Sequence, residues 1–119
     1  MKRPEIILVI AISLDGRIAL PQGGESHLGS KYDKKLLNKS LTNVDATLFG
    51  SGTLKAHQST FLVKKRHFFK NKQEIAVNQP ISIIAGNSMN FSRSWSYFNQ
   101  PIRRWLISSD RNIKDSKVN

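Results

Sequence analysis

The amino-acid sequence predicts an α/β fold with a mostly parallel sheet and flanking helices. Four apolar runs have the length of strands: residues 6–12, 46–49, 81–85 and 105–107, the last extended by Ser108. Their continuous apolar and largely β-branched composition is typical of strands that are buried on both faces. A segment with helical periodicity lies between the first two runs. Strands that alternate with helices favour a parallel sheet.

The helix between the first two strands is predicted to begin after Ser30. Ser30 and Asp33 have the spacing of a capping box, in which a hydroxyl and a carboxylate satisfy free backbone N–H groups. Apolar residues then recur at spacings of three and four, which gives the helix one apolar face. These residues are Tyr32, Leu36, Leu37, Leu41 and Val44.

A second helix is expected within residues 64–78, ahead of the third strand. The sequence NQP at 78–80 ends it, because a proline disfavours helical backbone at the residue before it. The run KKRHFFKNK at 64–72 is the densest basic part of the chain.

Length and composition limit the possible classes of protein. A chain of 119 residues suits one domain, residues 1–119. The absence of cysteine excludes disulfides, thiolate nucleophiles and Cys-ligated metal sites, and it is compatible with the cytoplasmic location that we expect. The longest apolar run, seven residues, is far shorter than a membrane span, so we expect no membrane partner.

The charge is strongly positive and unevenly distributed. The formal net charge is +11, with 8 basic and 5 acidic residues in 1–60 (+3) and 11 basic and 3 acidic residues in 61–119 (+8). This favours anionic partners such as nucleotides, phosphorylated metabolites or nucleic acid. No nucleic-acid-binding motif accompanies the charge. A basic binding module for nucleic acid or phosphorylated ligands is therefore an alternative function, and a solvated basic surface is the simplest interpretation.

Polar and small residues follow each predicted strand. The four runs lead into SLDGR at 13–17, GSGT at 50–53, GNS at 86–88 and SSD at 108–110. Ligands of open parallel sheets bind at the carboxyl ends of the strands. The sequence therefore predicts a ligand site at this edge.

The segment GSGT could cradle a phosphate. Gly50 and Gly52 lack a side chain where the backbone would approach a ligand, and Thr53 could cap the following short helix and offer its hydroxyl. His57 follows four residues later and could titrate near a ligand or lie on the surface. The segment is neither a Walker motif nor the full dinucleotide fingerprint, and an ordinary strand-to-helix turn also explains it.

The polar connection LPQGGESHLGS at 20–30 has two interpretations. It is either a flexible loop or a lid that presents Ser26, with His27 or Leu28 over a ligand ring. The three histidines, which include His67, lack the spacing of metal ligands, and no metal is expected.

Four motifs together resemble a known family. RPEIILVIAISLDGRIA, GGESHLGS, VDATLFGSGTLKAH and QPISIIAG match, in order and spacing, the reductase domain of riboflavin biosynthesis. This domain is the C-terminal half of bifunctional deaminase-reductases and has a dihydrofolate-reductase-like fold. The resemblance extends from Arg3 to about Ser109. It implies an NADPH-dependent reduction that opens the ribosyl ring of a 5-amino-6-ribosylamino-pyrimidinedione phosphate, with hydride passing from the nicotinamide to the ribosyl C1′.

The resemblance also implies roles for individual residues. The backbone around Ala11 and Ser13 lines the nicotinamide pocket. Gly50, Gly52 and Thr53 form the turn that binds the cofactor phosphate. Leu28 lies beside the cofactor, and Gly86 and Asn87 match another cofactor contact. His57 is counted with these cofactor-binding candidates. Arg17 and Ser26 match substrate-binding positions. No catalytic residue is assigned.

The sequence departs from the family pattern in places. His57 and Gln58 replace two aspartates, and Leu41 stands where the family helix has an arginine for the substrate phosphate, a loss for which Lys39 could compensate. The family domain also continues beyond the fourth strand with a Glu-Gly-Gly cofactor loop and a strand pair.

We therefore expect a partial reductase-like domain, with 110–119 as a tail or a truncated continuation and with an inactive fragment as an alternative. An incomplete sheet would leave an unpaired edge, and family members dimerise, so a homodimer is expected.

Overall fold

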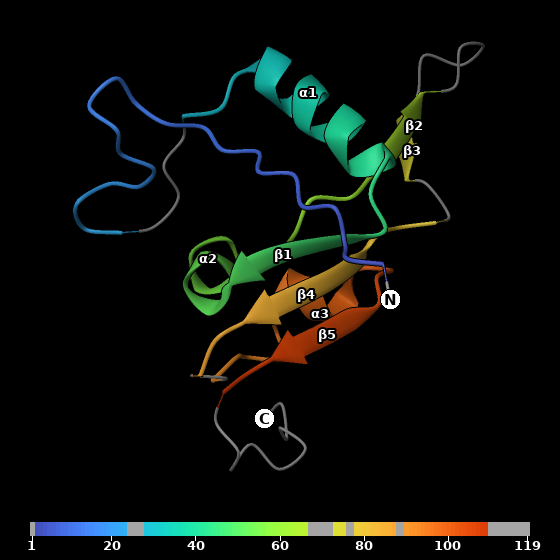
Figure 1. Cartoon of the computed structure of the whole chain (residues 1–119). Helices are drawn as coiled ribbons and strands as arrows, with labels where there is room; N and C mark the ends of the chain where they lie inside the picture. Colours follow the sequence, from blue (N-terminus) through green and yellow to red (C-terminus); the bar gives the residue numbers. More distant parts are fainter. Residues whose placement is uncertain (1, 24–27, 67–72, 76–77, 88–89, 110–119) are drawn as a thin grey trace.

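A parallel sheet is the centre of the fold (Figure 1). The computed structural model describes residues 2–23, 28–66, 73–75, 78–87 and 90–109. Its elements, in chain order, are α1 (Lys31–Thr42), β1 (Ala46–Gly50), α2 (Ser51–His57), β2 (Lys64–Arg66), β3 (Gln73–Ile75), β4 (Ile81–Ala85), α3 (Ser96–Asn99) and β5 (Arg104–Ile107). Strands β1, β4 and β5 form the sheet in the order β1-β4-β5, with both pairings parallel. This confirms the predicted α/β class.

Strand β4 occupies the middle of the sheet. It pairs with β1 from Ala46–Ile81 to Gly50–Ala85 and with β5 from Ser82–Arg104 to Ala85–Ile107. The side chains of Ser82 and Ile84 are buried, and the other residues of β4 are half-buried. Because the strands are parallel, their carboxyl ends lie at the same edge of the sheet.

The hydrophobic core lies between the sheet and the helices α2 and α3. Its buried members are Leu54 of α2, Ile84 of β4, Tyr97 of α3 and Phe91 of the connection between β4 and α3. The Tyr97 hydroxyl donates a hydrogen bond of 3.0 Å to Ser82 Oγ, so the two buried hydroxyls partner each other. Burial raises the pKa of the Tyr97 phenol, against the opposing effects of the Ser82 hydrogen bond and the Arg104 charge.

Arg104 closes the C-terminal end of α3. Its guanidinium donates to the backbone carbonyls of Tyr97, Gln100 and Ile102 at 2.6–3.1 Å, and it lies 5.3 Å from the centre of the Tyr97 ring. A cation at this end of a helix complements the helix dipole and satisfies carbonyls that lack an intrahelical partner. The first residue of β5 is thereby fixed to the preceding helix.

Side-chain amides hold the irregular connection from α2 to β2. Each amide accepts a hydrogen bond from a backbone N–H and donates one to the C=O of the same residue, as a neighbouring strand would. The pairs are Gln100 with Thr60, Gln79 with Val63 and Asn38 with Lys64, at 2.7–3.1 Å. Polar side chains thus satisfy backbone groups of Thr60 and Val63 in the connection and of Lys64 at the start of β2.

Helix α1 confirms the predicted capping box. Ser30 Oγ accepts hydrogen bonds from the backbone N–H groups of Tyr32 and Asp33, and the Asp33 carboxylate accepts one of 2.7 Å from the Ser30 N–H. The predicted apolar face is only partly covered, because α1 has no buried residue and Tyr32 and Leu36 are exposed.

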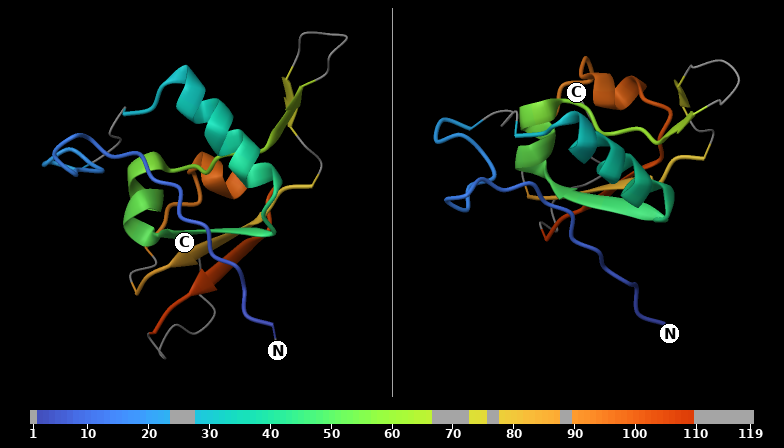
Figure 2. Two further views of the ribbon diagram at one scale, coloured as in Figure 1. Left: turned by 45° about the horizontal axis from the view of Figure 1, so that its top comes forward. Right: turned by 90° about the horizontal axis from the view of Figure 1, so that it is seen from above.

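The prediction of a buried strand at residues 6–12 is wrong. The segment forms neither strand nor helix, and its large apolar side chains are exposed, from 48% at Val9 to 85% at Ile6. A strand needs a hydrogen-bonded neighbour. In the described part of the chain β1 is bonded to β4 alone, and no strand pairs with residues 6–12. In the right-hand view of Figure 2 the first residues extend away from the sheet.

The expectation of burial on both faces is also wrong for the outer strands. Leu48 of β1 is 64% exposed, and Trp105 and Ile107 of β5 are 57% and 54% exposed. Only β4 has a neighbouring strand on each side within the described residues, which explains why its side chains are the best covered.

The predicted helix at 64–78 is wrong as well. Strands β2 and β3 pair antiparallel there, with Lys64 opposite Ile75 and Arg66 opposite Gln73. A helix would place the like charges of Arg66 and Lys70 four residues apart on one face, which is unfavourable. Residues 67–72, with His67 and much of the basic run, lie outside the described residues. Among the helices that the structure describes, none is long and apolar enough to cross a membrane.

Candidate functional site

The ends of three strands form the candidate site. We call it the carboxyl edge and define it as residues 50–53 after β1, residues 86–87 after β4 and residues 108–109 after β5. The Gly86 N–H donates to the Ile107 carbonyl at 3.0 Å, which extends the parallel ladder by one bond and holds the ends of β4 and β5 together. The predicted ligand edge therefore has a defined geometry.

The turn from β1 into α2 supplies backbone donors. Gly50 is the N-cap of α2, has extended backbone and makes no side-chain cap. The first N–H groups of a helix have no intrahelical partner, so those of α2 face the carboxyl edge. The prediction that Thr53 caps this helix is wrong, since α2 begins two residues earlier and Thr53 is an exposed residue of its first turn.

A close contact joins this turn to the end of β4. A Cβ atom on Gly86 would lie 2.6 Å from Ser51 Oγ and 2.8 Å from Ser51 Cβ, closer than such atoms approach. Only glycine at position 86 therefore lets Ser51 pack against the end of β4. This contact places the turn at 50–53 next to Asn87.

Asn87 is fixed by the end of β5. Its Oδ1 accepts hydrogen bonds from the Ser108 hydroxyl at 3.2 Å, the Ser109 N–H at 3.2 Å and the Ser109 hydroxyl at 2.9 Å. A backbone N–H can only donate, so the oxygen of the Asn87 amide must face Ser109. Ser51, Ser108 and Ser109 were not singled out as site residues from the sequence, although the SSD motif after the fourth strand was a usable signal.

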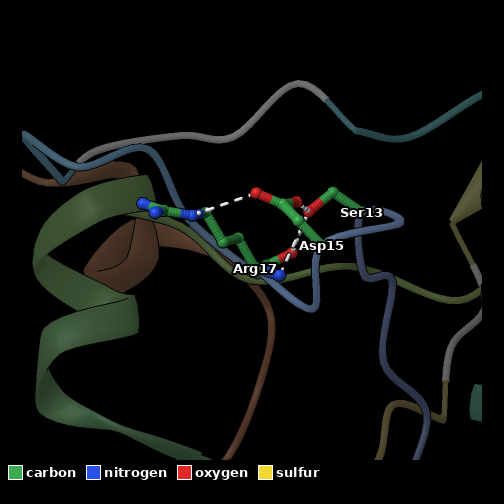
Figure 3. Close-up of polar contacts among 3 residues, drawn as sticks. All are labelled: Ser13, Asp15 and Arg17. Carbon is green, nitrogen blue, oxygen red and sulfur yellow. Dashed lines mark hydrogen bonds and ion pairs between the residues drawn. The ribbon is translucent and has the colours of Figure 1, made fainter.

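A second group of candidates forms a separate turn. The Ser13 N–H donates to the Arg17 carbonyl and the Gly16 N–H to the Ser13 carbonyl, both at 2.9 Å. Gly16 has φ +79°, a conformation that favours glycine. The Ser13 hydroxyl bonds the Asp15 carboxylate and accepts from the Arg17 N–H at 3.1 Å (Figure 3). Ser13 is thus the centre of a closed turn.

Arg17 already has an anionic partner. Its Nε lies 3.1 Å from Asp15 Oδ2, a contact that a dashed line marks in Figure 3. Both side chains are exposed, and exposed ion pairs are worth roughly 0–1 kcal/mol. A bound anion could therefore exchange with Asp15 at little cost.

The remaining candidates are scattered. Ala11 and Leu28 are exposed, and Ser26 and His27 lie outside the described residues. His57 is the last residue of α2, about 9 Å along the helix from Ser51 and away from the carboxyl edge. Figures 1 and 2 place the described part of residues 11–23 on the side toward which the three strands point.

The structure therefore brings Gly50, Gly52, Thr53 and Asn87 together at the carboxyl edge. Ser13 and Arg17 share a turn beyond that edge. The described residues include no group of three or more His, Asp or Glu that could hold a metal ion.

Comparison with known proteins gives one match. No curated protein and no solved structure matches the chain significantly. The family described as RibD C-terminal domain matches residues 4–119, nearly the whole chain. This agrees with the four motifs that resemble the reductase domain of riboflavin biosynthesis and with the α/β fold and its parallel sheet. The chain belongs to the RibD C-terminal domain family.

Proposed function

We propose that the carboxyl edge binds NADPH and that the domain serves in reduction of the ribosyl group of a 5-amino-6-ribosylamino-pyrimidinedione phosphate. The family membership supports a reductase of riboflavin biosynthesis. The observation that carries the proposal for the cofactor is the contact between Ser51 and Gly86, which joins the glycine turn at 50–53 to Asn87. Two of the segments that the family resemblance assigns to the cofactor are therefore neighbours in space.

The residues at this edge fit a phosphorylated cofactor. Backbone N–H groups at the start of α2, the Thr53 hydroxyl and the Asn87 amide are hydrogen-bond donors, which phosphate oxygens require. The described residues of the carboxyl edge include no carboxylate, and Asp110, which follows Ser109, lies outside the described residues. The net charge of +11 adds a long-range attraction for anions.

NADPH, when bound, supplies the hydride that passes to the ribosyl C1′. The turn at 50–53 holds a cofactor phosphate, and the backbone at Ala11 and Ser13 lines the nicotinamide side, with Leu28 beside it. Arg17 binds the anionic substrate by exchanging its contact with Asp15 for a substrate oxygen. The family resemblance also assigns substrate binding to Ser26, which lies outside the described residues.

Gly52 offers a sharp test. It is the second residue of α2, where glycine is a poorer helix former than alanine, and a Cβ there would meet nothing within 4 Å. Packing therefore does not require this glycine, whereas close approach of a ligand would. We expect Gly52→Ala to raise the melting temperature and to weaken NADPH binding, measured by nicotinamide fluorescence.

Gln58→Gly is the matched control at the other end of the same helix. Gln58 is the C-cap with φ +54°, a left-handed conformation in which glycine is favoured, so this variant should also raise the melting temperature. Its NADPH affinity should equal that of the unmodified chain. If the unmodified chain does not change nicotinamide fluorescence, the proposed function fails.

The alternative function, nucleic-acid binding, is tested by titrating a fluorescently labelled polynucleotide with the chain and following its fluorescence anisotropy. The observation in its favour is the basic strand β2, Lys64–Arg66, in a chain of charge +11. If the chain binds nucleic acid, its affinity for the polynucleotide should fall steeply as the salt concentration rises. Polynucleotide binding at low salt without NADPH binding would favour this alternative over the reductase.

We also propose that the chain forms a homodimer. The exposed apolar side chains of β1, β5 and residues 6–12 support this, because large exposed apolar patches mark interaction sites. Sedimentation equilibrium at high salt, where repulsion between two chains of charge +11 is screened, should give twice the 13.5 kDa chain mass. A monomer at all concentrations would contradict the proposal.

A further inference from the structure

We propose that Ser109 is a positioning residue that turns the amide NH2 group of Asn87 toward the bound cofactor. The inference rests on the proposed function and concerns a residue that the family resemblance does not assign. Ser109 contacts Asn87 twice, through its N–H at 3.2 Å and its hydroxyl at 2.9 Å. Both contacts end on Oδ1.

The contacts select one of the two orientations of the amide. The oxygen and the NH2 group of asparagine are nearly equal in size, so an exposed asparagine exchanges them by rotation. Here three donors converge on one position, and the Ser109 N–H cannot accept a hydrogen bond. The NH2 group of Asn87 must therefore lie on the other side of the amide carbon, away from Ser109.

The order of the strands shows in which direction the NH2 group of Asn87 points. Asn87 follows the middle strand β4, Ser109 follows β5 on one side, and the turn at 50–53 follows β1 on the other side. An amide whose oxygen faces β5 presents its NH2 group away from β5. The contact between Gly86 and Ser51 keeps the 50–53 turn close to that side. The geometry points to a donor aimed at an acceptor oxygen of the cofactor.

The backbone N–H and the hydroxyl of Ser109 both contribute to the orientation of the Asn87 amide. The N–H favours one orientation of the amide, and the hydroxyl stabilises that orientation further with the shortest of the three hydrogen bonds. Without the hydroxyl the amide is held less firmly, and part of the population presents its oxygen to an anionic ligand. An oxygen facing a phosphate is repulsive, so binding weakens through the orientation of the Asn87 amide rather than through a contact of the Ser109 hydroxyl with the ligand.

The experiment is a double-mutant cycle on the 119-residue chain, with NADPH affinity read from nicotinamide fluorescence. We expect Asn87→Ala to weaken binding about tenfold and Ser109→Ala about fivefold, as for loss of a direct and of a supporting hydrogen bond. Ser109→Thr, which keeps the hydroxyl, should restore the affinity. Ser109→Ala should add nothing in the Asn87→Ala background. Ser92→Ala, in the exposed turn with Ser94, is the control and should bind normally.

A ligand-free measurement accompanies the cycle. The side-chain NH2 signal of Asn87 in an NMR spectrum, assigned by its loss in Asn87→Ala, should shift in Ser109→Ala and return in Ser109→Thr. Unchanged affinity in Ser109→Ala, or an equal loss in both backgrounds, would overturn the positioning role and leave the proposed function standing. An unmodified chain that does not bind NADPH would remove both.

Discussion

Similar apolar runs have different structures in the sheet unit, residues 46–109, and in the N-terminal region, residues 2–42. Residues 81–85 form β4, which has a strand on each side and buries Ser82 and Ile84. Residues 6–12 are at least as apolar, yet they lie exposed without a strand partner in the described structure. The comparison shows that apolar β-branched composition favours a strand only where neighbouring backbone can pair with it.

The largest expected difference between the two regions concerns leucine. Leu54 of the sheet unit is fully buried, and Leu8 of the N-terminal region is 81% exposed. We expect Leu54→Ala to lower the free energy of unfolding by about 2–5 kcal/mol. Leu8→Ala should change it by less than about 0.5 kcal/mol. Urea denaturation measures both, and equal losses would show that residues 6–12 belong to the core.

A smaller difference is expected for glycine. A Cβ on Gly86 would collide with Ser51, whereas a Cβ on Gly29, just before α1, would meet nothing within 4 Å. We expect Gly86→Ala to cost about 1–3 kcal/mol of unfolding free energy, because the end of β4 and the start of α2 must separate. Gly29→Ala should be close to neutral. A neutral Gly86→Ala would mean that the two segments of the carboxyl edge are not in contact.

The smallest difference concerns tyrosine and depends on pH. Tyr97→Phe removes the hydrogen bond to Ser82 and should cost about 1 kcal/mol at pH 8, while Tyr32→Phe, at an exposed residue of α1, should cost almost nothing.

The pH dependence follows from the burial of the phenol, which raises the pKa of Tyr97 above the usual 10.0. The folded chain then holds this proton more tightly than the unfolded chain. The stabilisation is fully present below pH 10 and is lost as pH rises through the folded pKa. The stability advantage of the unmodified chain over Tyr97→Phe should therefore shrink above pH 10. A constant advantage between pH 8 and pH 11 would contradict this burial effect.

Local signals in the sequence predicted local structure well. The capping box of α1 needs only Ser30 and Asp33, three residues apart, and both sets of hydrogen bonds are present. Strands β1, β4 and β5 were predicted near their observed bounds, as was the edge at which their polar ends meet. In each case the interactions that decide the structure lie within one segment or follow from the parallel order of the strands.

Contacts between distant residues explain most of what was missed. The antiparallel pair of β2 and β3 depends on a partner that a helical pattern does not reveal. Asn87 and Ser109 are 22 residues apart, and Gln100 and Thr60 are 40 apart. The N-cap of α2 was placed three residues late, at Thr53 instead of Gly50, since Gly50 acts as N-cap without a side-chain signal. No periodicity or motif in a single sequence encodes these pairs.

The side-chain amides that bind the connection from α2 to β2 have a consequence for how this chain can change. The side-chain amides of Gln100 and Asn38 form hydrogen bonds with the backbone N–H and C=O groups of Thr60 and Lys64, respectively. The side chains of Thr60 and Lys64 take no part in these bonds. Substitutions at Thr60 and Lys64 are therefore free to accumulate, apart from proline. The constraint falls on the amides, where even an acid of the same shape would lose the donor. Within this family we therefore expect residues at the positions of Thr60 and Lys64 to vary widely. The amides at the positions of Asn38 and Gln100, which are distant in sequence, should vary little.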